Sequence, residues 1–194
     1  MLYSRLRPIS YAVIGVSVVA AIVIAIFTFQ QSQPALTELP VATQPEFELG
    51  MYGQTFSLAD AESLLGYEIK LPTYLPADNE LRMIKVDNNT KWSFVIYSPT
   101  GIDDSTKEKE LIENDGFIIT NAPAPEVTDV DAEIQRFVEF GGNEIMMKNF
   151  TGVGFTDIPL MLGYSEIHWW NDGLHRIVGA NFDFTELTKI IESI

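Results

Sequence analysis

Apolar residues form one long uninterrupted run near the start of the chain. Residues 12–29 read AVIGVSVVAAIVIAIFTF and contain no charge. A helix of this length spans roughly 27 Å at about 1.5 Å per residue, close to the ~30 Å hydrocarbon core of a bilayer. We therefore expect a transmembrane helix over residues 11–29, preceded by a short cytoplasmic tail, residues 1–10.

The charges that flank this run predict its orientation. Arg5 and Arg7 precede it, and the next basic residue is Lys70. Because basic residues favour the cytoplasmic side, we expect a single-pass cell-membrane protein with its C-terminal domain outside. A cleaved signal peptide is the alternative. The apolar part of such signals is typically ~7–15 residues long and ends in small residues, whereas this run is longer and ends in IFTF, which favours a retained anchor.

The pattern changes after the anchor. Residues 30–55 contain Pro34, Pro40 and Pro45 and have neither helical nor alternating periodicity, which is typical of a flexible linker. Residues 56–194 then provide about 140 positions, enough for one hydrophobic core. We expect a single extracytoplasmic domain there.

Helical spacing of apolar residues predicts three short amphipathic helices in this domain. The first begins near Ser57 and ends at Gly66, the second covers residues 131–140, and the last begins at Asp183. Two prolines, Pro72 and Pro76, predict an extended passage after the first helix.

Alternating or continuous apolar runs predict strands at residues 81–86, 92–98, 116–120, 144–150, 158–162, 164–170 and 174–180. Residues 101–115 read as a charged loop, and Pro123 and Pro125 interrupt the run that starts at 116. Hairpin turns are expected at residues 87–91 and 171–173. The order of elements predicts the α+β class, with an antiparallel sheet covered by helices on one face.

Two segments carry a resemblance to a known family. Residues 69–76, IKLPTYLP, and residues 167–194, which contain IHWWNDGLHRIVG and FTELTKIIESI, resemble the DUF4367 domain family. The resemblance implies the outer domain of a membrane-anchored prokaryotic protein, some of these proteins being anti-sigma-like regulators. It implies more distantly a curved sheet like that of half-barrel lipoprotein carriers and related sensor domains, which is an analogy of fold alone. The family has no established catalytic residues to carry over.

Composition excludes several kinds of chemistry. The chain has 12 Lys and Arg against 27 Asp and Glu, and without Arg5 and Arg7 the part after the anchor has 10 against 27, a net charge of −17. Such a surface repels nucleic acid, so we expect no nucleic-acid partner. There is no cysteine, which excludes disulfides, thiol catalysis and thiolate metal sites.

The two histidines of the chain, His168 and His175, both lie in the last predicted hairpin. A two-residue turn at Asp172-Gly173 places Trp170 opposite His175 and both imidazoles on one face, whereas a three-residue turn places them on opposite faces. A metal would need further ligands, so we predict neither a metal nor a catalytic site here.

Three other motifs are incomplete. Residues 163–167, GYSEI, lack the second glycine of a nucleophile elbow. Residues 152–154, GVG, complete neither a dinucleotide nor a phosphate loop and are expected to form a bend. Residues 129–134 alternate acids like a calcium loop but have Ile134 where that loop requires glycine. We expect no catalytic residue and no cofactor.

The aromatic residues of the last third supply candidate ligand contacts. Tyr164, Trp169 and Trp170 could line an apolar cavity, and the two tryptophans, being adjacent on a strand, should point to opposite faces. Asn88 and Asn149 match the N-x-Ser/Thr pattern and are candidate glycosylation sites.

The sequence therefore predicts a membrane-anchored extracytoplasmic binding module, not an enzyme, that recognises an apolar or amphipathic ligand or an envelope protein partner. The alternative is an envelope-stress sensor or regulatory ectodomain acting through a membrane partner, because about ten residues inside the cell are too few for an effector domain. A hydrolase is the less favoured reading, since no motif is complete.

Overall fold

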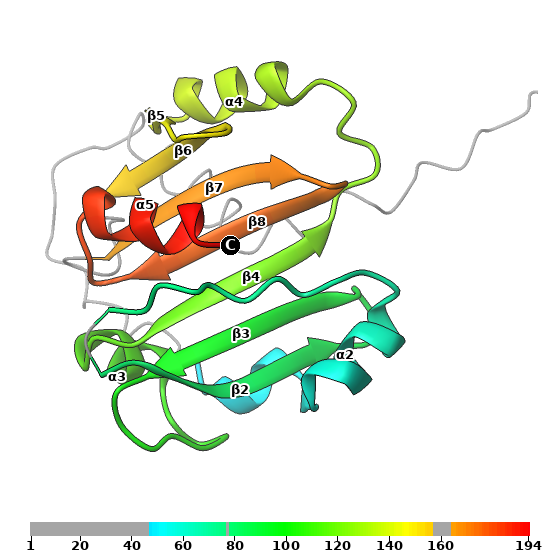
Figure 1. The fold of residues 1–194 in the computed structure, drawn as a ribbon, viewed down its shortest axis with the longest axis vertical. Helices are drawn as coiled ribbons and strands as arrows, with labels where there is room; N and C mark the ends of the chain where they lie inside the picture. The colour runs from blue at the N-terminus through cyan, green and yellow to red at the C-terminus, as the bar shows by residue number, and fades with distance from the viewer. Residues whose placement is uncertain (1–46, 77, 157–163) are drawn as a thin grey trace, which may run out of the picture. The chain divides into compact units, whose positions relative to one another are not determined.

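A computed structural model describes residues 47–76, 78–156 and 164–194 of the chain (Figure 1). The expected tail, transmembrane helix and linker up to residue 46 lie outside this part. Within the three described ranges, no helix is long and apolar enough to cross a membrane.

The described residues form an open antiparallel sheet of eight strands. The strands are β1 (Gln54–Thr55), β2 (Glu80–Asp87), β3 (Trp92–Ser98), β4 (Phe117–Pro123), β5 (Asn143–Met146), β6 (Thr151–Thr156), β7 (Ser165–Asn171) and β8 (Leu174–Ala180). Their order is β1-β2-β3-β4-β8-β7-β6-β5. The α+β class and the antiparallel sheet are confirmed.

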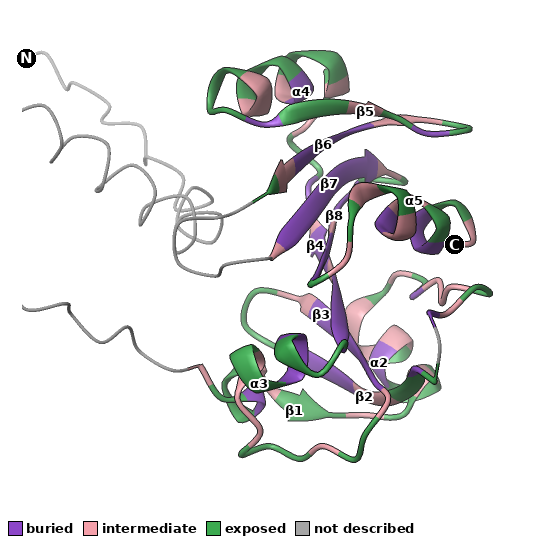
Figure 2. Ribbon diagram, turned by 90° about the vertical axis from the view of Figure 1, so that its left-hand side faces the viewer, coloured by how far each residue is buried: buried purple, intermediate pink, exposed green. Residues whose placement is uncertain are grey.

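The helices cover both faces of the sheet (Figure 2). We call the face under α2 (Leu58–Leu65) and α5 (Phe184–Glu192) the first face, and the face under η2 (Leu49–Tyr52), α3 (Glu108–Glu113) and α4 (Val130–Glu139) the second face. The expectation that helices cover one face was wrong. Successive strand residues such as Val95 and Ile96 are both fully buried, so each face needs its own cover.

Local side-chain hydrogen bonds explain where the predicted helices begin. The side chains of Ser57, Asp129 and Asp183 cap α2, α4 and α5 by accepting hydrogen bonds from backbone amides three residues further on. Gly66 ends α2 in the left-handed conformation. All three predicted helices are confirmed.

The proline-punctuated passage after α2 crosses the first face between α2 and α5 (Figure 1). Ile69 is buried there, and its backbone amide donates to Glu62 Oε1 at 2.9 Å. Thr73 and Tyr74 both hydrogen-bond to Ser193 at the end of α5. This passage therefore ties the two helices of the first face together.

Some boundaries differ from the expectation. The fold begins before residue 56, because Leu49 of η2 is fully buried and β1 pairs with β2. Helix α3 occupies part of the expected loop, and β4 continues to Pro123, where a proline is tolerated because the strand ends there. The strand expected at 144–150 is the shorter β5, and the strand expected at 158–162 lies outside the described residues.

The bend expected at residues 152–154 is wrong, because these residues lie inside β6. A Cβ on Gly154 would lie 2.4 Å from Ile145 Cδ1 and 2.6 Å from Phe184 Cζ. A Cβ on Gly152 would lie 2.7 Å from the backbone oxygen of His168. The glycines make room for neighbouring groups and do not break the strand.

Candidate functional site

The β7–β8 hairpin carries most of the candidate side chains. Its turn consists of Asp172 and Gly173, both with positive φ (53° and 71°), and Asn171 pairs with Leu174. Trp170 therefore pairs with His175. Both imidazoles lie on the second face, the arrangement expected for a two-residue turn.

The two tryptophans point to opposite faces, as strand geometry predicts. Trp169 belongs to the first-face core and stacks on Phe150, with ring centroids 6.3 Å apart. Trp170 belongs to a second-face cluster with Ile134 and Val153. The two indole rings therefore cannot line one cavity on a single face of the sheet.

Tyr164 lies just before β7, against Gly179 of β8. A Cβ on Gly179 would lie 1.9 Å from the Tyr164 hydroxyl, so a glycine is required for this contact. Burial, and to a lesser extent the carboxylate of Glu166, raises the pKa of Tyr164 well above its usual value. Because Gly179 pairs with Glu166, Tyr164 lies on the second face, on the opposite side of the sheet from Trp169.

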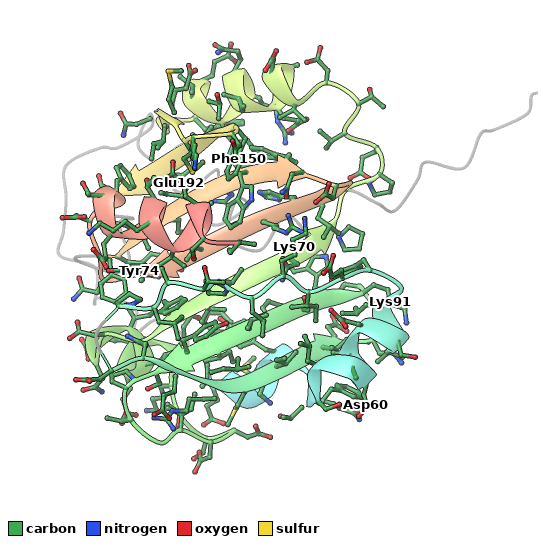
Figure 3. The ribbon with its side chains drawn as sticks, in the orientation of Figure 1. Asp60, Lys70, Tyr74, Lys91, Phe150 and Glu192 are labelled. Carbon is green, nitrogen blue, oxygen red and sulfur yellow. The ribbon has the colours of Figure 1, made fainter. Side chains whose placement is uncertain are left out.

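A hollow of about 500 Å³ opens beside the hairpin turn; we call it the hairpin groove. Its apolar lining consists of Phe150, Trp170, Ile191 and Ile194, and its polar lining of Lys70, Asn149, Asn171, Asp172 and Glu192. Figure 3 labels Lys70, Phe150 and Glu192 on the side of the sheet that carries α5. Of the three predicted ligand contacts, Trp170 is among the residues that border this groove, although its ring lies on the second face, and Tyr164 and Trp169 are not part of the lining.

Ion pairs and hydrogen bonds organise the polar rim of the groove. Lys70 Nζ lies 2.9 Å from Asp172 Oδ2, and this bond holds the pKa of Asp172 below its usual value. Glu192 Oε1 accepts a hydrogen bond of 2.6 Å from the backbone amide of Lys148. The rim thus presents both signs of charge beside an apolar floor.

A second hollow of about 290 Å³ shares Lys70 and Asp172 with the groove and is also lined by Arg176. Arg176 is 1% exposed, and its Nε donates to Asn121 Oδ1 at 3.0 Å while its guanidinium also donates to Asn171 Oδ1. The sequence analysis missed this residue. The sequence did contain a signal for it. Arg176 stands two residues before the apolar Val178 on a predicted strand, so the two share a face, and a cation buried there needs polar partners.

The second face carries a buried polar series that we call the histidine array: Glu166, His168 and His175. Glu166 Oε2 lies 2.8 Å from His168 Nε2, and His168 Nδ1 lies 3.0 Å from His175 Nε2. Each residue is at most 9% exposed. Glu166 was missed by the sequence analysis, although its position two residues before His168 on one strand predicts a shared face.

An aromatic ring packs directly on the array. His175 stacks on Trp170 with centroids 4.6 Å apart and an interplanar angle of 5°. Burial, followed by the neighbouring His168 and Arg136, holds the pKa of His175 well below its usual value. No group of three or more His, Asp or Glu in the described part of the chain has the geometry of a metal site.

The two candidate glycosylation residues are both exposed. Asn88 lies in the β2–β3 turn, where its Oδ1 accepts from Lys91 Nζ at 2.6 Å. Asn149 lies at the hairpin groove, just before β6. Attached sugar at Asn149 would therefore stand beside the groove.

Comparisons of the chain with protein-family models, with curated proteins and with solved structures give no match. The resemblance to the DUF4367 family accordingly stays an expectation from the sequence.

Proposed function

We propose that this protein is a single-pass membrane-anchored binding module whose outer domain takes an amphipathic ligand in the hairpin groove. The observation that supports the proposal best is the composition of the groove: the apolar side chains of Phe150, Ile191 and Ile194 next to Lys70, Asp172 and Glu192 in a hollow of about 500 Å³. Ligand sites are typically clefts of ~300–1,000 Å³ with an apolar lining and a few placed polar groups.

The two parts of the lining have different roles in this proposal. Phe150, Ile191 and Ile194 offer apolar surface to a hydrocarbon chain. Lys70 and Glu192, with the amide of Asn149, offer charge and hydrogen bonds to a polar head. These proposed contacts bind the ligand and do not convert it chemically, so we propose binding without catalysis.

The proposed location rests on the sequence. The uncharged run at residues 12–29, with Arg5 and Arg7 before it, favours an anchor that leaves the domain outside the membrane. An envelope amphiphile would be available to a domain in that place. The family resemblance also suggests that the sheet is curved like a half-barrel, and we include this curvature in the proposal.

The test is a binding experiment on the full chain in lipid nanodiscs. Octanoate and octylamine, two water-soluble single-chain probes of opposite head charge, are titrated while tryptophan emission is recorded, because Phe150 of the groove stacks on Trp169. We expect a saturable emission change with at least one probe.

Two matched variants locate the binding. Ile194→Glu places a charge in the groove and should abolish the saturable change. Leu81→Glu is the control, because Leu81 is 40% exposed on β2 and is not among the groove residues. Absence of saturable binding to either probe, or equal binding by both variants, would contradict the proposal.

A further inference from the structure

The histidine array lies under α4, the helix that connects the two halves of the sheet. Phe137 of α4 places its ring centroid 5.1 Å from His168, 5.2 Å from Trp170 and 5.9 Å from His175. The ring centroid of Phe155 of β6 lies 5.5 Å from that of His168 and 6.2 Å from that of Phe137. The surface on which α4 rests therefore includes both imidazole rings and the indole of Trp170, beside Ala124 and Val153.

One assignment of protons to the ring nitrogen atoms satisfies both contacts of the array. An ionised Glu166 accepts, so His168 donates from Nε2 and its Nδ1 accepts from Nε2 of His175. In this arrangement both imidazoles are neutral and each contact has one donor and one acceptor.

The array can accommodate one additional proton but not two. A proton added to His168 lies next to the Glu166 carboxylate, and the bond to His175 survives with its direction reversed once neutral His175 carries its own proton on Nδ1. A second proton on His175 would turn both nitrogen atoms of the 3.0 Å contact into donors. It would also place two cations side by side in a buried layer.

Few counter-charges face His175. Trp170 stacks on it and Ala122 is its strand partner, so its immediate surroundings are apolar. Arg136 of α4 adds positive charge, although Glu133 partly offsets it through an ion pair of 2.6 Å. Among the described residues, the other titratable groups on this face include Glu166 and Tyr164 by β7, Tyr52 and Glu108 of η2 and α3, Glu144 of β5, and Lys85 of β2, which pairs with Asp104.

Helix α4 has fewer fully buried residues than α5. Ile134 is its single buried residue, whereas α5 buries Leu187, Ile190 and Ile191. An element with little buried apolar surface opens at a lower free energy than the rest of the domain.

We propose that the histidine array is an acid-sensitive latch for α4: with neutral imidazoles the helix stays packed, and protonation of His175 breaks the contact with His168 and releases the helix. The proposal is independent of ligand binding in the hairpin groove.

The direction of the pH effect follows from the histidine. The pKa of His175 is lower in the packed form than the ordinary value of about 6.5, so the packed form binds fewer protons than the open form. The stability of the packed form is therefore complete above about pH 6.5 and declines as the pH falls below it.

The test is hydrogen–deuterium exchange of the full chain in nanodiscs at about pH 7.5 and about pH 5, each corrected for the intrinsic exchange rate. We expect α4 amides to exchange at least about tenfold faster at the lower pH, because the opening equilibrium changes up to tenfold per pH unit below the ordinary histidine pKa of about 6.5, while α5 amides change little. Equal changes in α4 and α5, or none in either, would overturn the proposal.

A variant and a direct measurement complete the test. His175→Phe keeps a flat ring over Trp170 but cannot titrate, so exchange of α4 should lose its pH dependence; persistence of that dependence would overturn the latch. Ring-carbon NMR of the two histidines in the unaltered chain gives a readout that needs no variant. His175 must gain its proton over the same pH range in which α4 opens, and a neutral His175 beside an open α4 would contradict the proposal.

Discussion

At the scale of single residues, two buried cations show how this acidic domain uses its few basic side chains. Lys85 is fully buried on β2, and its Nζ lies 2.7 Å from Asp104 Oδ1 and donates to Gly53 O at 3.2 Å. It thereby joins the η2–β1 connection and the loop before α3 to the sheet. Neither Lys85 nor Arg176 was assigned a partner from the sequence. Asp104 and Asn121 are distant along the chain, and Asn171, although five residues from Arg176, approaches it through the β7–β8 pairing.

The two members of the Lys85–Asp104 pair should respond unequally to substitution. The Asp104 side chain is 68% exposed and stays solvated without its partner, whereas Lys85 without Asp104 keeps a buried charge and the carbonyl of Gly53. We expect Asp104→Ala to lower the free energy of unfolding by about 2–3 kcal/mol and Lys85→Met to lower it less. Urea unfolding of the full chain in detergent, followed by tryptophan emission, measures both. An Asp104→Ala variant as stable as the unaltered chain would contradict this account.

At the scale of elements, the sequence predicted those whose signals are local. The helices α2, α4 and α5 carry their own capping residues, and the β7–β8 turn carries its own Asp-Gly pair. Helix α3 was missed because its six residues, EKELIE, contain just two apolar side chains, which are adjacent. Strand β6 was missed because its two glycines read as a bend, and the role of Gly154 depends on Phe184 of a distant helix.

The features of the candidate site were likewise predictable where their signals are local and unpredictable where they are not. The shared face of the two histidines and the opposed tryptophans follow from strand periodicity and turn length. The hairpin groove could not be predicted, because Lys70, Phe150 and Ile194 meet there from three separate parts of the chain.

Helix α5 offers a test of how the first face is stabilised. Leu187 is fully buried in the first-face core, as the amphipathic pattern predicted. Leu187→Ala should lower the free energy of unfolding by roughly 2–5 kcal/mol, because it removes buried methyl groups and leaves a cavity. Thr185→Ala on the exposed side of the same helix is the matched control and should change it by less than about 0.5 kcal/mol. Equal unfolding midpoints of the two variants in urea would show that α5 contributes nothing to the core.

At the scale of the whole domain, the sheet consists of two antiparallel meanders, β1 to β4 and β5 to β8, that join where β4 pairs with β8. The α+β class was predictable because each meander has local hairpin signals. The junction was not, because seven residue pairs from Phe117–Ala180 to Pro123–Leu174 connect segments that no turn relates. Helix α4 lies in the connection between the meanders, so opening the histidine latch would loosen the link between the two halves of the sheet.

The proposed topology concerns the full chain and has the most direct test. Arg5 and Arg7 precede the apolar run, and the part after it carries a net charge of −17, so insertion should leave the N-terminus inside and the domain outside. Protease added to intact cells or spheroplasts should remove a C-terminal tag and spare an N-terminal tag. A retained anchor further requires that both tags be found on one polypeptide before proteolysis, whereas signal cleavage would separate them. Protection of the C-terminal tag with loss of the N-terminal tag would overturn the location, and with it the access of the hairpin groove to envelope amphiphiles.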